Sequence, residues 1–346
     1  MDFIDLRSDT VTHPTPAMRE AMAKAEVGDD VYGEDPTVNR LQEMAAAIMG
    51  QETGLFVASG TMGNLAAILA HCGRGDEAIL GDKSHTFYFE AGGISVLGGV
   101  PSYQLPNQPD GSLAIEDIQS ALRDPSDPHY PFSRLVALEN THNRCGGTFQ
   151  TPEYTRQLCD FAHTHGLVVH LDGARIFNAA AAQGIAAKEL TAPVDSVTFC
   201  LSKGLCAPVG SVLCGSKAFV AKAHRIRKML GGGMRQAGIL AAAGIVALET
   251  MIERLAEDHA RARKLADGLM QVPGLAVDAG SPATNMVFLS LADEVTLNGL
   301  QVEEKMKANG VLISAISEQR FRLVTHYWID DAGVEKTVAA FRQVLH

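Results

Sequence analysis

Basic tracts, paired cysteines and long apolar runs are all missing from this sequence. Lys and Arg number 29 against 40 Asp and Glu, which gives a formal net charge of -11. No stretch is rich in Lys or Arg, so the composition favours neither nucleic acid nor an anionic membrane as a partner. No unbroken apolar stretch reaches about 18 residues, the length that a membrane-spanning helix requires.

The cysteines form no C-x-x-C pair and no spacing typical of a disulfide framework. They are Cys72, Cys145, Cys159, Cys200, Cys206 and Cys214. We therefore expect reduced thiols, as in a cytosolic protein. The first residues also lack the basic and apolar regions of a secretory signal peptide. Together these absences predict a cytoplasmic protein.

The chain is 346 residues long, a length that allows about two domains. Short apolar runs alternate with helical segments, which predicts an α/β fold with a mainly parallel central sheet and helices on both faces. We expect an N-terminal arm and helix over residues 1–25 and a large domain over residues 26–245. A linking helix and a smaller C-terminal α/β domain are expected over residues 246–346.

Two apolar runs within residues 167–210 organise the rest of the chain. The first, residues 167–171, ends at Asp172 and is followed by Arg175; the second, residues 197–201, is followed by Lys203. A helical segment between the runs makes the two predicted strands parallel, so both end at the same edge of the sheet. Open α/β sheets bind ligands at that edge. We therefore expect the acid, the arginine and the lysine to converge there.

These three side chains suit a pyridine cofactor. A carboxylate keeps the ring nitrogen protonated, a lysine forms an imine with the ring aldehyde, and an arginine stabilises the ring phenolate. At about 4 Å and an effective dielectric of roughly 20, an ion pair contributes about 4 kcal/mol, or about three pKa units. Taken alone, Asp172 is better explained by a helix cap or a magnesium ligand, and Lys203 by an exposed turn. The pair on successive strand ends, with a phosphate-type loop upstream, favours the cofactor.

Residues upstream of these runs offer further candidates. A Ser59-Gly60-Thr61 turn follows a predicted strand and opens a helix, a setting in which backbone amides bind anions. It matches neither G-x-G-x-x-G nor a Walker A motif, which disfavours a nicotinamide oxidoreductase. His85 follows another predicted strand, where it acts as a base, lies against a cofactor ring or is an ordinary surface histidine.

Candidates elsewhere have structural explanations of equal weight. Lys228 and Arg235 flank three glycines and either meet an anion or mark a hinge. Arg322 lies within an alternating apolar strand and pairs with a substrate carboxylate or a structural acid. Tyr32 lies in a polar, Gly-punctuated loop that could reach a neighbouring subunit, and His129 lies in a proline-rich loop that gives it no structural role.

Several longer motifs, in order along nearly the whole chain, make the sequence resemble the low-specificity L-threonine aldolases. This family consists of pyridoxal-phosphate enzymes of the aspartate-aminotransferase fold. The motifs are DLRSDTVT from Asp5, GDDVYG from Gly28, ENTHN from Glu139, HLDGAR from His170, LSKG from Leu201, GGGMRQ from Gly231 and RLVTH from Arg322.

The resemblance implies a role for each candidate in binding pyridoxal 5'-phosphate. Lys203 would carry the imine, Asp172 would pair with the pyridine nitrogen, Arg175 would contact the ring oxygen and His85 would stack on the ring. The phosphate would be bound by Ser59, Gly60 and Thr61, with Lys228 and Arg235 from an adjacent subunit. No metal ion is expected.

The resemblance also implies a substrate and an assembly. Ser8 and Arg322 would hold the amino-acid carboxylate, while Tyr32 and His129 would approach from a partner chain. Such a protein would be a homotetramer, a dimer of dimers with shared active sites.

The expected reaction is cleavage of L-threonine or L-allo-threonine, and of other L-β-hydroxy-α-amino acids, to glycine and an aldehyde. His85, His129 or a water that they hold would remove the β-hydroxyl proton. The alternatives are a β-eliminating lyase or an aminotransferase on the same fold, which would break the Cα–H bond. A noncatalytic protein that binds pyridoxal phosphate is the alternative from another class.

Overall fold

The computed structural model describes residues 3–345, which form two compact units. The large unit spans residues 14–252, and the small unit joins the N-terminal residues through His13 to those from Glu253 onward. The expected N-terminal arm of residues 1–25 is divided between them, because strand β1 (Ile4–Asp5) pairs with a strand of the small unit while helix α1 (Pro16–Lys24) packs in the large one.

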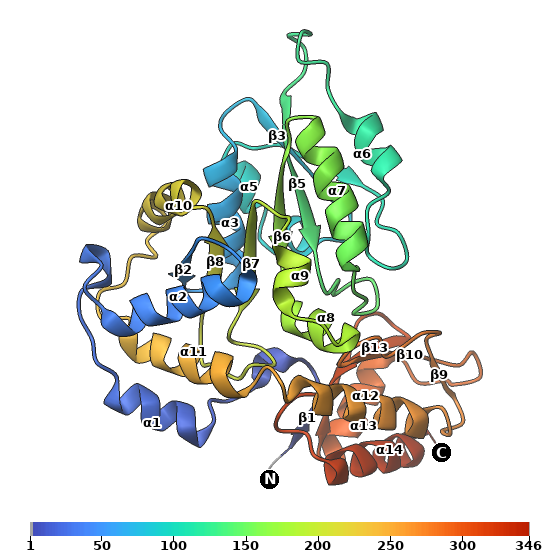
Figure 1. The fold of residues 1–346 in the computed structure, drawn as a ribbon. Helices are drawn as coiled ribbons and strands as arrows, with labels where there is room; N and C mark the ends of the chain where they lie inside the picture. Colours follow the sequence, from blue (N-terminus) through green and yellow to red (C-terminus); the bar gives the residue numbers. More distant parts are fainter. Residues whose placement is uncertain (1–2, 346) are drawn as a thin grey trace. The chain divides into compact units, whose positions relative to one another are not determined.

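The large unit alternates strands and helices over most of its length (Figure 1). Its strands are β2 (Thr53–Val57), β3 (Asp76–Gly81), β4 (Ser102–Leu105), β5 (Phe132–Glu139), β6 (Val168–Asp172), β7 (Ser196–Cys200) and β8 (Ser211–Gly215). Its further helices are α2 (Pro36–Met49), α3 (Gly60–His71), α4 (His85–Tyr88), α5 (Gly93–Val96), α6 (Ile115–Ala121), α7 (Pro152–Thr164), α8 (Ile176–Gln183), α9 (Ala187–Thr191), α10 (Lys217–Met229) and α11 (Gly238–Thr250).

Across the described residues, the strands of the large unit form one sheet in the order β2-β8-β7-β6-β5-β3-β4. Every neighbouring pair is parallel except the two that involve β8. Since β2 and β7 both run antiparallel to β8, β2 points the same way as the parallel strands and ends at the same edge. The expectation of a mainly parallel sheet is confirmed, and β4 is a strand that sequence reasoning missed.

Helices cover both faces of this sheet, as expected (Figure 1). Helices α3 and α10 pack together on one face, and α2 and α7 lie on the other. Side-chain caps define where several of these helices begin. Thr15 Oγ1 accepts from the Met18 amide at the start of α1, and Thr151 Oγ1 accepts from the Tyr154 amide at the start of α7. Both starts follow the Thr-Pro signal in the sequence.

The small unit is built on an antiparallel sheet in the order β12-β13-β10-β9 among its described residues. Its elements are α12 (Leu255–Leu269), β9 (Leu275–Val277), β10 (Met286–Leu291), α13 (Gly299–Ala308), β11 (Val311–Leu312), β12 (Ser314–Ala315), β13 (Arg320–Val324) and α14 (Asp331–Leu345). Apolar side chains of α12, α14, β10 and β13 form its core. Helix α11 ends at Thr250 and α12 begins at Leu255, and the two units divide between these helices.

Within residues 3–345, the helices fall short of the length and apolar character that crossing a bilayer demands. The six cysteines are buried free thiols. Burial raises the pKa of Cys72 and Cys159 to about 12, so these thiols are poor nucleophiles.

Candidate active site

Asp172 and Lys203 follow neighbouring parallel strands. Asp172 is the last residue of β6 and pairs in register with Thr198 of β7, and Lys203 comes three residues after β7 ends at Cys200. The Asp172 carboxylate is buried and held at both oxygens: Oδ1 accepts from the Ala174 amide over 3.0 Å, and Oδ2 accepts from an asparagine side chain over 2.8 Å. Its orientation at the sheet edge is therefore fixed.

His85 is the first residue of α4, and its ring is about one third exposed. The ring Nδ1 lies 2.9 Å from Glu90 Oε1. Burial lowers the pKa of His85, but the hydrogen bond to Glu90 and the charges of Asp172 and Glu90 outweigh it, so the pKa is raised overall; the charge of Lys203 opposes them. Asp172 and Lys203 both act electrostatically on this ring. The structure thus brings the predicted acid, lysine and stacking histidine into one electrostatic environment.

The tautomer of His85 follows from its contact with Glu90. A carboxylate only accepts hydrogen bonds, so a neutral His85 carries its hydrogen on Nδ1 and leaves the lone pair on Nε2. An imidazole with a lone pair on an accessible nitrogen is suited to general-base chemistry. Glu90 is buried, and burial raises its pKa while the hydrogen bond to His85 lowers it.

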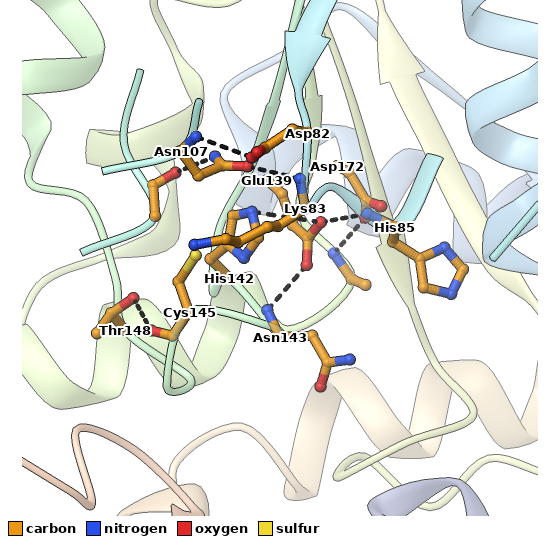
Figure 2. A network of polar contacts seen from close by, with 12 residues as sticks. Asp82, Lys83, His85, Asn107, Glu139, His142, Asn143, Cys145, Thr148 and Asp172 are labelled. Carbon is orange, nitrogen blue, oxygen red and sulfur yellow. Dashed lines mark hydrogen bonds and ion pairs between the residues drawn. The ribbon is translucent and has the colours of Figure 1, made fainter. Parts of the chain in front are cut away.

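Glu139, the last residue of β5, anchors the backbone on which His85 stands (Figure 2). Its carboxylate accepts from the His85 amide over 2.6 Å and from the Asn143 amide over 2.8 Å. The His85 amide opens α4 and the Asn143 amide follows the end of β5, and Asp172 lies near His85 (Figure 2). A buried carboxylate therefore fixes the start of α4, and with it the position of the His85 ring.

The turn between β2 and α3 has the form of an anion site. Ser59 Oγ accepts from the Met62 amide over 3.2 Å, and the Ser59 carbonyl accepts from the Gly63 amide over 3.0 Å. Across residues 3–345, the amides of Gly60 and Thr61 have no acceptor, which leaves two donors at the positive end of the helix dipole for a phosphate. All three predicted phosphate-binding residues lie at this helix start.

Glycine is required where α3 crosses β7. A Cβ at Gly60 would lie 2.9 Å from Cys200 Sγ, and one at Gly63 would lie 2.5 Å from Thr198 Cγ2. The start of α3 therefore packs directly on the strand that leads to Lys203. This close packing places the amides at the start of α3 beside the end of the strand that Lys203 follows.

Three side chains of the site also have the composition of a metal centre. One ligand atom from each of His85, Glu90 and Asp172 lies within 4.8 Å of the other two. Two carboxylates and a histidine attract a cation of any kind. A protonated pyridine nitrogen supplies the same positive charge beside Asp172, so the cluster fits the predicted cofactor without a metal ion.

Four predicted residues lie at the surface of the single chain. The Tyr32 and His129 side chains are largely exposed, and Lys228 is exposed at the last turn of α10. Arg235 is exposed and pairs with Asp29 over 3.0 Å. The chain by itself does not bring these side chains to the buried group around Asp172. Their assignment to a neighbouring subunit's site stays a prediction.

The predicted carboxylate-binding residues belong to the small unit. Ser8 caps the 3-10 turn Asp9–Val11, where its Oγ accepts from the Thr10 amide over 3.2 Å. Arg322 lies in the middle of β13 and donates from Nη2 to the Arg7 carbonyl over 3.2 Å. The two are thus neighbours within that unit. In the large unit, Arg175 is buried just before α8.

Sequence reasoning did not assign a role to several residues of the site. They are Asn64, Glu90, Glu139 and His170, all buried. A polar residue within an otherwise apolar element was the available signal for two of them: Asn64 lies in an almost wholly buried helix, and His170 in a buried strand. Glu90 gave no such signal, because it falls in an irregular, Gly-rich segment.

Comparison with known proteins identifies the family of this chain. The sequence model of the beta-eliminating lyase family matches residues 5–294. Low-specificity L-threonine aldolase 1 of Arabidopsis thaliana is 47% identical over 347 residues, covering 100% of this chain and 97% of that protein. The low specificity L-threonine aldolase of Escherichia coli K12 is 46% identical, covering 99% of each chain.

The chain belongs to the low-specificity L-threonine aldolase family. Solved structures confirm the fold. A threonine aldolase of Leishmania major is 21% identical with a TM-score of 0.84, covering 99% of this chain and 100% of that one. A putative L-allo-threonine aldolase of Listeria monocytogenes is 22% identical with a TM-score of 0.81, covering 99% and 97%.

Pyridoxal phosphate is the cofactor of this aldolase family, as the sequence predicted. The structure offers a direct test of fit. Gly60 and Thr61 present two amides without acceptors at a helix start, which suits a phosphate. Asp172 is a buried carboxylate fixed by donors at both oxygens, which suits a protonated ring nitrogen. The residues present therefore fit the group.

Proposed function

We propose that this chain cleaves L-threonine and L-allo-threonine, and other L-β-hydroxy-α-amino acids, to glycine and an aldehyde. The observation that carries the proposal is the 47% identity with a low-specificity L-threonine aldolase over the whole chain. The buried Asp172, the adjacent His85 and the anion site at Ser59 supply the chemistry that such a reaction needs.

Each residue that would hold the cofactor has a distinct task. Lys203 would bind its aldehyde carbon, Asp172 its ring nitrogen and Arg175 its ring oxygen, with Gly60 and Thr61 on its phosphate. When bound, the pyridinium ring accepts the electron pair released when a bond to the substrate Cα breaks. The residues of the chain decide which bond that is, because they orient the substrate and move its protons.

We propose His85 as the residue that takes the β-hydroxyl proton. Glu90 fixes the His85 tautomer with its lone pair on Nε2, and Glu139 holds the His85 backbone over 2.6 Å. Transfer of the hydroxyl proton to Nε2 turns the C–O bond into a carbonyl as the Cα–Cβ bond breaks. Acetaldehyde then leaves, and protonation of Cα gives glycine.

Replacement of His85 tests this assignment. His85→Asn and His85→Phe are expected to lower kcat by about 10²-fold or more, the usual contribution of a general base. Cofactor content, read from the absorbance of the bound cofactor, is expected to change little. An unchanged kcat would remove His85 from the proton transfer and leave His129 or a bound water as the base.

We further propose that Ser8 and Arg322 bind the carboxylate of the amino acid, with Arg175 and Tyr32 also contacting the substrate. A guanidinium binds a carboxylate through two parallel hydrogen bonds, which a lysine cannot reproduce. Arg322→Lys is therefore expected to raise KM for L-threonine by at least tenfold while the affinity for pyridoxal phosphate stays the same. A parallel loss of cofactor affinity would contradict the assignment.

We propose that the protein is a homotetramer, a dimer of dimers in which Tyr32, His129, Lys228 and Arg235 enter the partner's site. Large apolar side chains exposed on the large unit support an interface there; they include Tyr32, Phe89, Val96, Leu97 and Met229. Aromatic and methionine side chains are enriched at surfaces that another chain covers. Lys228 and Arg235 are also exposed cations that could reach a phosphate outside their own chain.

Subunit complementation tests the shared site. Lys203→Ala and Lys228→Ala proteins, each with low activity, are co-expressed to form mixed dimers. If Lys228 serves the partner's site, one of the two sites in a mixed dimer contains both native lysines, and up to half of that dimer's activity returns. If both lysines serve the same chain, every site has one defect and activity stays low. Light scattering on the purified protein gives the oligomeric order.

The activity itself is tested by incubating the protein, loaded with pyridoxal phosphate, with L-threonine and L-allo-threonine. Glycine and acetaldehyde in equal amounts are expected, with none formed by Lys203→Ala. Ammonia with a keto acid would identify a β-eliminating lyase, and a need for an amino acceptor would identify an aminotransferase. A bound cofactor with no turnover of any β-hydroxy amino acid would identify a noncatalytic binder.

We also propose a cytoplasmic location, which the six buried free thiols support.

A further inference from the structure

A chain of hydrogen bonds crosses the core of the large unit and ends on Asp172. Its central residue is Asn64, which is buried in α3. Asn64 Nδ2 donates to Asp172 Oδ2 over 2.8 Å and to Glu90 Oε1 over 2.9 Å. An amide nitrogen has two hydrogens, so one group serves both carboxylates. The opposite orientation of the amide would set its oxygen against two carboxylates.

The other links run from Asn64 away from the site. Asn64 Oδ1 lies 3.1 Å from His170 Nε2, and His170 Nδ1 lies 2.9 Å from Ser196 Oγ. Ser196 Oγ in turn lies 2.8 Å from His71 Nε2. His170 and Ser196 are fully buried in adjacent strands, β6 and β7. We call His71, Ser196, His170 and Asn64 the relay.

One arrangement of protons satisfies every contact of the relay. Burial lowers the pKa of His170 to about 3 and that of His71 to about 4, so both rings are neutral and carry one hydrogen each. Because the Asn64 oxygen only accepts, the hydrogen of His170 is on Nε2, and its Nδ1 accepts from the Ser196 hydroxyl. The Ser196 oxygen then accepts from His71 Nε2. Every donor therefore points toward the two carboxylates.

The carboxylates need this donor because they are close together. The ligand atoms of Asp172 and Glu90 lie within 4.8 Å of each other, and like charges repel at that distance in a buried site. Buried polar groups need hydrogen-bond partners, and this need explains the hydrogen bonds of His170 and of Ser196 when each residue is considered separately. It does not explain why their donors converge on the two acids that serve the cofactor site.

We propose that Asn64 is a positioning residue for the cofactor ring, and that His170 and Ser196 fix the orientation of its amide. One amide then holds both the acid expected beside the ring nitrogen and, through Glu90, the histidine expected to stack on the ring. This inference rests on the proposed function, since pyridoxal phosphate supplies the ring nitrogen. The relay acts on the proton of that nitrogen through Asp172.

Asn64→Leu removes both donors while keeping the number and branching of the side-chain heavy atoms. Two properties of the reconstituted protein test the proposal. The first is the ratio of its affinity for pyridoxal phosphate to its affinity for an analogue that has CH in place of the ring nitrogen. The second is the 15N chemical shift of the labelled ring nitrogen in bound pyridoxal phosphate. Affinity for pyridoxal phosphate is expected to fall at least tenfold, with little change for the analogue. The 15N shift is expected to move toward that of an unprotonated pyridine.

Two further variants keep the test decisive. Ser196→Ala removes one hydroxyl from the relay and is expected to move the 15N shift in the same direction by less; it decides the matter if Asn64→Leu does not fold. Thr155→Val removes a buried hydroxyl of α7 that donates to the Thr151 carbonyl, and both properties are expected to stay at the wild-type values. Equal losses for the two cofactors, or an unmoved 15N shift, would overturn the proposal.

Failure of the proposed function has a different signature. A wild-type protein that binds pyridoxal phosphate with a protonated ring nitrogen but does not cleave L-threonine would refute the aldolase reaction. The relay would stand in that case, because its two measured properties do not depend on turnover.

Discussion

Asp30→Ala is expected to destabilise the large unit more than any surface change, because it leaves a charge buried without a partner. Arg227 Nη2 lies 2.7 Å from Asp30 Oδ2, and the two side chains are 1% and 5% exposed. Arg227 Nη1 also donates to the Phe56 carbonyl over 2.7 Å, three residues before Ser59. Removing one partner of such a pair costs about 3–5 kcal/mol, a large part of a typical stability of about 5–15 kcal/mol.

Urea unfolding of the cofactor-free protein, followed by circular dichroism, measures this loss. Glu20→Ala is the matched control, because it breaks the exposed ion pair with Lys24 and is expected to cost less than about 1 kcal/mol. The decisive variant is Asp30→Ala with Arg227→Met, which removes the unpaired charge and is expected to regain part of the stability. A double variant no more stable than Asp30→Ala would refute the reasoning.

Three further changes probe the site. Glu90→Gln removes a charge that raises the pKa of His85. Because only neutral His85 accepts a proton, the acidic limb of the pH profile of kcat/KM is expected at lower pH than in the wild type. An unshifted limb would contradict the pairing of His85 with Glu90. Ser59→Ala removes the cap of α3, costs about 1 kcal/mol of unfolding free energy, and is expected to weaken binding of pyridoxal phosphate but not of unphosphorylated pyridoxal; equal weakening would contradict a phosphate site. Gly63→Ala sets a Cβ 2.5 Å from Thr198 and is expected to lower Tm by several degrees, whereas Gly73→Ala, with only a contact at 3.8 Å, is expected to change it little.

The sequence predicted the parts of the fold that depend on local pattern. Apolar runs bounded by turn residues located β6 and β7, and the parallel crossover between them placed Asp172 and Lys203 at one edge. Short or exposed strands escaped the same reasoning, because β4 and β9 lack a sustained apolar pattern. The division of the chain was also beyond local pattern, since it depends on β1 pairing with β11, more than 300 residues away.

The site was predictable to the extent that a residue's chemistry shows in the sequence. The polar, Gly-punctuated loop that carries Tyr32 was expected to reach a neighbouring subunit, yet its Asp30 turns inward to Arg227. That pairing spans nearly 200 positions, so no local spacing reveals it. The role of Asn64 could not be predicted either, because its hydrogen bonds to Asp172 and Glu90 depend on how α3 packs on the sheet.

Helix α3 carries the backbone amides of Gly60 and Thr61 at its start and the side-chain amide of Asn64 one turn later. A helix rises about 1.5 Å per residue, so Gly60 and Asn64 are separated by roughly 6 Å along its axis. Both groups belong to one helix, so the distance between them stays constant when the loops move. A ligand that meets both the Gly60 amide and the Asp172 carboxylate, which Asn64 holds, would therefore have to match a distance that the helix keeps constant.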